Sequence, residues 1–426
     1  MAMFKAVTRC RICGCEDLAP VLNLGVQSLT GIFPASAEEP VPQCPLELVK
    51  CLGGCGLVQL KHTCELRRLY SPRYGYRSGL QPSMVRHLEA IVARLEDFVP
   101  LEPGDLIVDI GSNDGTLLRS WPQGKFQLMG IDPILEKFEG DYPPEISKAA
   151  EFFTADLVRK HFPGRKAKVV TAIAMFYDVE SPLDFLSQVC EVLADDGVFV
   201  FEQSYLPFLL SRNAYDTVCH EHLSYYALSQ IVWMAERAGL KIVNVSLNAV
   251  NGGSFIVTAA RAASPYPEGR DVLRRLLEAE SLQGLDQPFL YQRFESAVRR
   301  HRDALRDVVG QWARRGRRAV GYGASTKGNV VLQYCGMTPD DLLCVAEINP
   351  EKFGCFCPGS RIPIVPQDKA LEMDPDVLLV LPWHLRDDII AREQSFLRAG
   401  GEMLFSLPEM EFFKFRPSVR RQPLGV

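Results

Sequence analysis

The segment YDTVCHEHLSYY, residues 215–226, concentrates chemically active side chains in His220, Glu221 and His222. The chain has 7 histidines in all, so two of them in three positions suggest a chemical role. An imidazole titrates near neutral pH and can act as a general base, and a carboxylate can orient it. The alternatives are a polar cluster that caps a helix starting near Leu223, or a metal site. HEH lacks the spacing that would place two metal ligands on one helix face.

A second group of reactive side chains lies near the N-terminus, where seven of the 13 cysteines fall within the first 64 residues. Paired thiolates on two tight turns form the tetrahedral sulfur site that zinc prefers, and such a closed site is structural. The second pair has one residue more than the usual spacing, so Cys15 or Cys44 could replace a ligand. Buried free cysteines are the other interpretation. The predicted zinc ligands are Cys10, Cys13, Cys51 and Cys55.

The composition is that of a soluble globular protein with several domains. The chain has 426 residues, 47% of them hydrophobic and 23% charged, and this length exceeds one ordinary core. A net charge of −5 does not indicate a nucleic-acid partner. No apolar run approaches the roughly 18–20 residues that span a bilayer, and the start lacks a signal-peptide core. With its odd cysteine count, the sequence predicts a cytoplasmic protein without a membrane partner.

Strands and helices alternate after the cysteine-rich start. Residues 101–121, LEPGDLIVDIGSNDGTLLRSW, predict a buried strand, a glycine turn and a helix start. A second strand ends at Asp132, and further strands are expected over 168–176 and 197–204 with a helix over 182–194. Such alternation is typical of an α/β fold with a mostly parallel sheet.

A second, smaller α/β domain is expected after a helical stretch from about 268 to 316. Residues 317–335 contain another strand, glycine turn and helix start, and strands follow over 342–350, 376–383 and 402–408. The predicted division is a zinc-binding module over 1–80, a cofactor-binding domain over 81–262 and a C-terminal Rossmann-like domain over 263–412.

The turn GSNDG after the first strand of the α/β region predicts a nucleoside-bearing ligand. Asp132, at the end of the second strand, can accept both ribose hydroxyls. The turn does not match G-x-G-x-x-G, and its acidic groups favour a cation that bears an adenosine, such as S-adenosylmethionine. A strand-turn-helix without a ligand is the alternative. The predicted cofactor-binding residues are Asp109, Gly111, Ser112, Asn113, Asp114, Gly115, Asp132, Pro133, Phe152 and Phe153.

A set of motifs resembles one family along nearly the whole chain, from residue 9 to about 408. CRICG, CGLVQL, YGYRSG, DIGSNDGTLL, GIDP, CHEHLSYY, NGGSF and GYGASTKGN occur in the order found in sugar C-methyltransferases, typified by the tetronitrose C-3 methyltransferase. The resemblance implies a class I methyltransferase domain of Rossmann-like α/β fold, flanked by a zinc module and a C-terminal domain. It implies a nucleotide-linked 4-keto-6-deoxyhexose as substrate, S-adenosylmethionine as methyl donor and structural Zn²⁺.

The resemblance also implies roles for the opening segment. His222 matches the family's base, which would remove the proton beside a ketone, and Glu221 would orient an imidazole or a sugar hydroxyl. His220 and Tyr76 are further candidates for the same pocket. The chain departs from the family at Cys219, where a tyrosine is usual, and after the fourth strand, where Tyr177 replaces a histidine and could donate to an enolate oxygen.

The C-terminal domain is the expected nucleotide-sugar site in a monomer or homodimer, unless it only supports the fold. Its glycine turn offers hydroxyls, a lysine and backbone amides to a diphosphate. An O-methyltransferase, an NAD-dependent sugar oxidoreductase and a non-catalytic zinc scaffold are the rival interpretations. The predicted substrate-binding residues are Ser325, Thr326, Lys327, Asn329, Lys352, Ser360 and Arg361.

Overall fold

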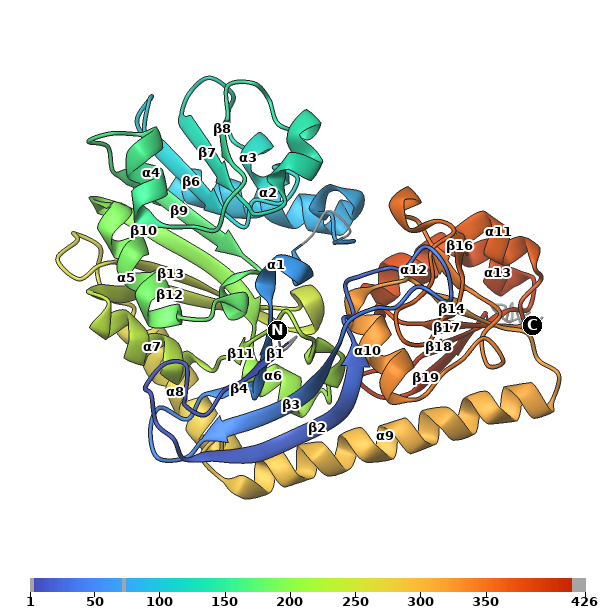
Figure 1. Ribbon diagram of the computed structural model, residues 1–426. Helices are drawn as coiled ribbons and strands as arrows, with labels where there is room; N and C mark the ends of the chain where they lie inside the picture. The colour runs from blue at the N-terminus through green and yellow to red at the C-terminus, as the bar shows by residue number, and fades with distance from the viewer. Residues whose placement is uncertain (1–3, 71–73, 416–426) are drawn as a thin grey trace, which may run out of the picture. The chain divides into compact units, whose positions relative to one another are not determined.

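The computed structural model of the protein describes residues 4–70 and 74–415. The chain forms two compact units, of which the first comprises residues 1–32 and 41–298, and the second residues 33–40 and 299–426 (Figure 1). Residues 263–298 group with the first unit, and the division into three domains with the predicted boundaries stays a prediction. Within the described ranges, no helix combines the length and the apolar character that crossing a bilayer requires.

The cysteine-rich start forms an antiparallel sheet of four strands in the order β11-β4-β3-β2. The three N-terminal strands are β2 (Leu18–Ser28), β3 (Gln43–Cys51) and β4 (Val58–Leu60). The fourth, β11 (Ser224–Tyr225), lies in residues 215–226, the HEH segment, and its Ser224 pairs with Gln59. The sheet therefore joins that segment to the N-terminal module. A separate pair is formed by β1 (Phe4–Ala6) and β5 (His62–Cys64).

The centre of the first unit is a sheet of seven strands in the order β12-β13-β10-β9-β6-β7-β8 (Figure 1). Only β13 runs against its neighbours, because it pairs antiparallel with both β10 and β12 while the other pairs are parallel. This order with one reversed strand is the class I methyltransferase arrangement. The strands are β6 (Leu106–Ile110), β7 (Gln127–Ile131), β8 (Ser147–Ala149), β9 (Ala167–Ile173), β10 (Leu193–Ser204), β12 (Leu240–Asn248) and β13 (Ser254–Arg261).

Amphipathic helices cover this sheet. In α2 (Pro82–Phe98), apolar residues at helical spacing bury one face, with Leu88, Ile91 and Leu95 in the core. The central strands are apolar on both sides because helices pack on both faces. The other helices are α1 (Leu66–Leu69), α3 (Thr116–Arg119), α4 (Ala155–His161), α5 (Pro182–Val192), α6 (Leu206–Ser211), α7 (Leu228–Arg237) and α8 (Arg270–Gln283).

The long helix α9 (Pro288–Arg314) leads into the second unit, whose sheet has the order β16-β15-β14-β17-β18-β19. Its strands are parallel except for β19 at the edge. They are β14 (Ala319–Tyr322), β15 (Val345–Glu347), β16 (Ile364–Pro366), β17 (Val377–Val380), β18 (Glu402–Phe405) and β19 (Glu411–Lys414). The helices are α10 (Thr326–Tyr334), α11 (Gln367–Glu372), α12 (Arg386–Arg392) and α13 (Gln394–Arg398).

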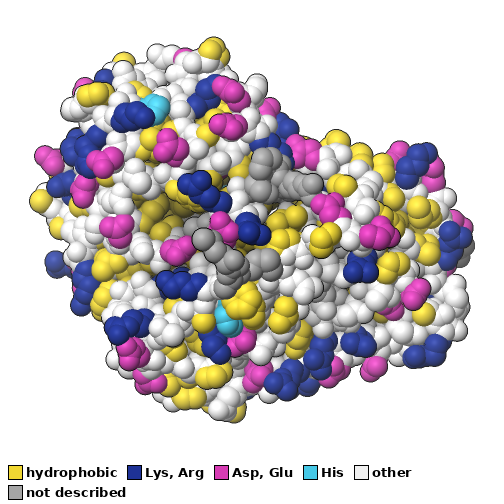
Figure 2. All heavy atoms as spheres, viewed as in Figure 1, with side chains coloured by type: hydrophobic (Ala, Val, Ile, Leu, Met, Phe, Trp, Pro, Cys, Tyr) yellow, Lys and Arg dark blue, Asp and Glu magenta, His cyan; other side chains and the backbone are white. Residues whose placement is uncertain are grey.

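Charged side chains of both signs alternate over the face of the molecule seen in Figure 2, with apolar residues scattered between them. No large patch of one sign stands out on that face. This distribution agrees with the small net charge of −5 and gives no basic stripe for a nucleic acid on the side shown.

Candidate active site

The four predicted zinc ligands come together in the N-terminal module. The sulfur atoms of Cys10, Cys13, Cys51 and Cys55 all lie within 4.8 Å of one another. The Cys10 and Cys55 sulfurs are 3.4 Å apart, and those of Cys13 and Cys51 are 3.6 Å apart. A tetrahedral ion with Zn–S bonds of about 2.3 Å requires sulfur–sulfur distances of roughly 3.8 Å. The cluster therefore fits zinc with only a small adjustment, and neither Cys15 nor Cys44 belongs to it.

Backbone close to the sulfurs leaves no room for larger residues. A Cβ atom at Gly54 would lie 2.5 Å from the Cys13 sulfur and 3.1 Å from the Cys51 sulfur. Gly14 and Gly56 adopt positive φ angles of 72° and 77°, which side chains disfavour. A hydrogen bond with the Cys55 thiol is the largest cause that lowers the pKa of Cys10, to about 5. Burial raises the pKa of Cys51 to about 12, and the hydrogen bond with Cys10 raises the pKa of Cys55. The fit of the module to one ion therefore rests on the positions of the four sulfur atoms.

A cavity of about 360 Å³ opens at the carboxyl ends of the central strands in the first unit. Phe152 and Phe153 line it together with six of the predicted turn and strand-end residues. Ligands of open α/β sheets bind at this edge, and a largely apolar cavity with a few polar groups is typical of a small-molecule site. The six are Asp109, Gly111, Ser112, Asn113, Asp132 and Pro133.

Asp132 is held in a fixed orientation at the cavity wall. The backbone amides of Asn113 and Ile134 each donate to one of its carboxylate oxygens, both at 2.9 Å. Each oxygen keeps a further lone pair, so the carboxylate can accept from a ribose diol. Asp109 is buried behind it and accepts a hydrogen bond from the Thr171 hydroxyl at 2.6 Å. Burial raises the pKa of Asp109 to about 7.

Two of the predicted cofactor residues, Asp114 and Gly115, do not line the cavity. The Asp114 side chain is fully buried and accepts from the Thr116 hydroxyl at 2.6 Å and the Gly79 amide at 2.9 Å. Gly115 has a φ of 74° at the start of α3 and lies against the Tyr142 ring. In the structure these residues fix the turn and place the 75–80 segment beside it.

No helix begins near Leu223, so the HEH segment does not cap one. Residues 215–217 form a single 3-10 turn, the chain continues to β11, and α7 begins only at Leu228. Both His220 and Glu221 are buried, with 1% and 3% of their surfaces exposed. Burial lowers the pKa of His220 to about 4 and raises the pKa of Glu221. Both groups therefore favour their neutral forms.

His222 is oriented by the backbone and packed against a phenol. Its Nδ1 donates to the Thr217 carbonyl at 2.8 Å, so the neutral ring carries its basic lone pair on Nε2. The ring centroid lies 4.0 Å from that of Tyr177. Burial raises the pKa of Tyr177 well above that of a free phenol, which keeps its hydroxyl protonated. The pair thus combines a base of fixed tautomer with a hydrogen-bond donor.

Tyr76 lines the cavity, and so do several residues that were not predicted, among them Tyr70, Tyr74 and Asp178. The Tyr70 hydroxyl donates to Asp178 at 2.6 Å. Burial raises the pKa of Asp178 well above the usual range of a carboxyl group. The signal for Asp178 was present, because it follows the fourth strand at the edge where ligands bind.

In the second unit, the glycine turn contains Ser325 at the N-cap of α10, where its hydroxyl accepts from the Gly328 amide at 2.9 Å. Thr326 and Lys327 form the first turn of that helix, and Asn329 is fully buried. The amides at this helix start can bind an anion.

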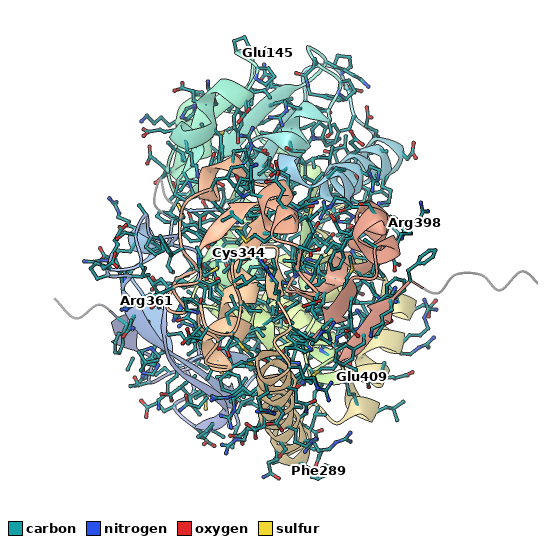
Figure 3. All side chains as sticks on the ribbon, turned by 90° about the vertical axis from the view of Figure 1, so that its right-hand side faces the viewer. Glu145, Phe289, Cys344, Arg361, Arg398 and Glu409 are labelled. Atoms are coloured by element: carbon teal, nitrogen blue, oxygen red, sulfur yellow. The ribbon has the colours of Figure 1, made fainter. Side chains whose placement is uncertain are left out.

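The other predicted substrate residues of this unit lie apart from the turn in sequence. Lys352 is buried, and its ammonium group donates to the Ala324 carbonyl at 2.7 Å and lies 3.6 Å from Glu347. Ser360 is also buried. Arg361 is exposed, and its backbone φ is 59°. Figure 3 labels Arg361 together with Cys344, which is buried. Lys352 is therefore engaged within the fold, and Arg361 remains available to solvent.

Family models account for most of the chain. A "Putative zinc binding domain" matches residues 10–70, a "Methyltransferase domain" matches 82–245, and a "C-methyltransferase C-terminal domain" matches 249–408. The C-methyltransferase NovU of Streptomyces niveus is 32% identical over 411 residues, which cover 95% of this chain and 96% of NovU. The order of the three matches is the order of the modules predicted from the sequence.

Two solved methyltransferase structures align with less than half of the chain. Magnesium protoporphyrin IX methyltransferase (ChlM) from Synechocystis PCC 6803 is 16% identical, with a TM-score of 0.32 over 42% of this chain and 83% of ChlM. The CcbJ methyltransferase from Streptomyces caelestis is 14% identical, with a TM-score of 0.32 over 42% of this chain and 90% of CcbJ.

Proposed function

Since the chain belongs to the C-methyltransferase family and uses S-adenosylmethionine, we propose that it methylates a sugar carbon, C-3 of a nucleotide-linked 4-keto-6-deoxyhexose. The observation that carries the proposal is the fixed tautomer of His222 beside Tyr177, one residue from the cavity-lining Asp178. A base and acidic donors at one place are what enolisation of a ketone requires.

The cavity supplies the groups for the methyl donor. S-adenosylmethionine provides an electrophilic methyl group on a sulfonium centre. Asp132 would accept hydrogen bonds from the ribose, and Phe152 and Phe153 offer apolar surface to the adenine. Asp109 and the 111–113 turn complete the wall of this cavity.

The chemical step begins on the sugar. His222 Nε2 takes the proton from C-3, and the electron pair of that C–H bond moves into the enolate. Tyr177 stabilises the developing charge by donating to the oxygen at C-4, since its hydroxyl stays protonated. The enolate carbon would then bond to the methyl group of the donor while the sulfur–methyl bond breaks, and the sulfur would keep that electron pair and leave as a neutral thioether. Glu221, adjacent to the base, has the role of orienting an imidazole or a sugar hydroxyl.

Asp178 is a second candidate hydrogen-bond donor, in addition to Tyr177. Burial raises the pKa of Asp178 and outweighs the hydrogen bond from Tyr70, which acts in the opposite direction. The carboxyl group at the cavity wall therefore favours its neutral form and can donate to an oxygen. Cys219, which stands where the family usually has a tyrosine, is buried and lacks the reach of a phenol. We therefore expect a substrate or product configuration that differs from that of tetronitrose methylation.

The glycine turn of the second unit is our assignment for the diphosphate of the substrate. Amides at the start of α10 and the Lys327 ammonium group favour an anion there. Because the Ser325 hydroxyl already caps the helix, Thr326 and Lys327 are the stronger contacts of this turn. Arg361, which is exposed, is a second cation for the same group.

The test is exchange of the C-3 hydrogen for deuterium in D₂O, without methyl donor, followed by mass spectrometry of the product after the donor is added. Exchange at C-3 and a product with a new C–CH₃ group are expected. A methyl ether without exchange would establish the rival O-methyltransferase, and hydride transfer to a nicotinamide would establish an oxidoreductase. A panel of nucleotide-linked 4-ketosugars identifies the substrate.

A further inference from the structure

A second cluster of metal-ligand side chains lies in the first unit, apart from the four zinc ligands. It consists of Cys44, Cys64 and His220, whose potential ligand atoms all lie within 4.8 Å of one another. Cys44 is on β3, Cys64 ends β5, and His220 belongs to the HEH segment. The segments are separated by up to 176 residues in sequence, so only the fold reveals the cluster.

The imidazole of His220 is prepared to bind a metal. Its Nε2–H donates to the backbone carbonyl of Cys44 at 3.0 Å, which leaves the lone pair on Nδ1. Nδ1 is buried and has no hydrogen-bond partner among the described residues. Histidines that bind metals characteristically donate their other ring nitrogen to a carbonyl or carboxylate, since this fixes the tautomer and orients the lone pair.

The two sulfur atoms complete the donor set. Cys44 and Cys64 are 1% and 4% exposed, and both are free thiols. They lie in a small apolar cluster with Leu29 and Leu69. Two thiolates would neutralise a divalent ion, so the loaded site would carry no net charge in these apolar surroundings.

We propose that Cys44, Cys64 and His220 form a second zinc site that fastens the HEH segment to the N-terminal module. Binding releases two thiol protons to solvent and forms two Zn–S bonds and one Zn–N bond. A solvent molecule takes the fourth position, as in open zinc sites with two cysteines and one histidine. Since Glu221 and His222 directly follow His220, the ion fixes the start of the segment that contains them. The site itself does not depend on the proposed reaction.

The test is the zinc content of the full-length protein by plasma mass spectrometry, after loading with Zn²⁺ and removal of loose metal on a chelating resin. The expected content is about two zinc ions per chain in the wild type. It falls to about one in Cys64→Ser and in His220→Ala, and stays at two in the control Cys357→Ser, which alters an equally buried cysteine of the second unit. Circular dichroism checks that each variant is folded.

X-ray absorption of the wild type gives a readout that needs no variant. One site with four sulfurs and one with two give about three sulfur ligands per zinc on average, whereas a loosely bound second ion would give about two.

The proposal is overturned by a wild-type content of one zinc, by an average of two sulfurs, or by a second zinc that a folded Cys64→Ser variant retains. A Cys44–Cys64 disulfide in the non-reduced protein, detected by peptide mass spectrometry, would equally exclude it.

Discussion

Replacement of Asp109 by asparagine should remove a pH-dependent loss of stability. Asp109 lies in β6, one residue before its end, is 3% exposed, and accepts from the Thr171 hydroxyl at 2.6 Å. Burial is the main cause that raises its pKa from 3.8 to about 7, and Asp132 adds to the effect. Asparagine has nearly the same shape and cannot ionise, so it keeps the wall of the cavity while removing the titration.

The direction in which stability changes with pH follows from the linkage between proton binding and folding. An acid whose pKa is higher in the folded protein favours folding in its protonated form, so its contribution is complete below the unfolded pKa of 3.8 and is lost as pH rises through about 7. A difference of about three pKa units corresponds to about 4 kcal/mol, of which about half is lost by pH 5.5. We therefore expect Asp109→Asn to equal the wild type near pH 4 and to exceed it by about 4 kcal/mol at pH 8.

The assay is thermal unfolding of both proteins across pH 4–8, with zinc bound and without methyl donor, followed by near-UV circular dichroism. Since 1 kcal/mol shifts the midpoint by about 2–4 °C in a large domain, the expected gain at pH 8 is on the order of 10 °C. Asp195→Asn is the matched control, because that side chain is fully exposed and its removal should give no such trend.

A difference between Asp109→Asn and the wild type that stays constant from pH 4 to pH 8 would refute the reasoning. So would a variant that is less stable than the wild type at pH 8, because the carboxylate would then be stabilised in the fold. Either result would mean that the Thr171 hydroxyl and unseen solvent compensate the ionised form.

Three further outcomes are expected. His222→Ala should keep the affinity for S-adenosylmethionine in calorimetry but lose turnover by at least about 100-fold. The control His161→Ala, which alters an exposed histidine, should keep its turnover. Near-normal turnover of His222→Ala would remove His222 from the role of base. Cys10→Ser should lose one zinc and unfold at lower temperature because metal binding is coupled to folding, and unchanged melting would contradict this. Gly54→Ala should weaken zinc retention against a chelator, since its methyl group would lie 2.5 Å from the Cys13 sulfur; retention equal to that of the wild type would show that the loop can move aside.

The local features of the fold could be predicted from the sequence. The strand, turn and strand end that carry Gly111 and Asp132 are specified by residues close together in the chain, and both residues line the cavity. Each pair of cysteines is likewise local in sequence. The two pairs are separated by 37 residues, and that they come together was inferred from the sulfur coordination that zinc prefers.

Contacts with residues distant in sequence could not be predicted for several of the candidate site residues. Lys352 carries a positive charge that suits a phosphate, but its ammonium group donates to the Ala324 carbonyl within the fold. Asp114 looked like part of the ligand turn, and instead it binds the Gly79 amide. The Tyr70–Asp178 hydrogen bond joins residues 108 positions apart. Sequence patterns report the type of a side chain, whereas such pairings decide whether its polar atoms remain available to a ligand.

The N-terminal module contacts the segment that contains the proposed base through the same kind of long-range pairing, so we expect the module to affect catalysis. His220 donates to the Cys44 carbonyl, the Thr30 hydroxyl lies 3.4 Å from the Glu221 carboxylate, and Tyr225 pairs with Val58. These contacts flank the proposed base on both sides in sequence, so a module loosened by loss of zinc would also release that segment. Because displacement by about 1 Å can cost 100-fold in rate, a structural ion far from the reacting carbon can still control turnover. The metal is then part of the machinery that orients the base, although it touches neither substrate.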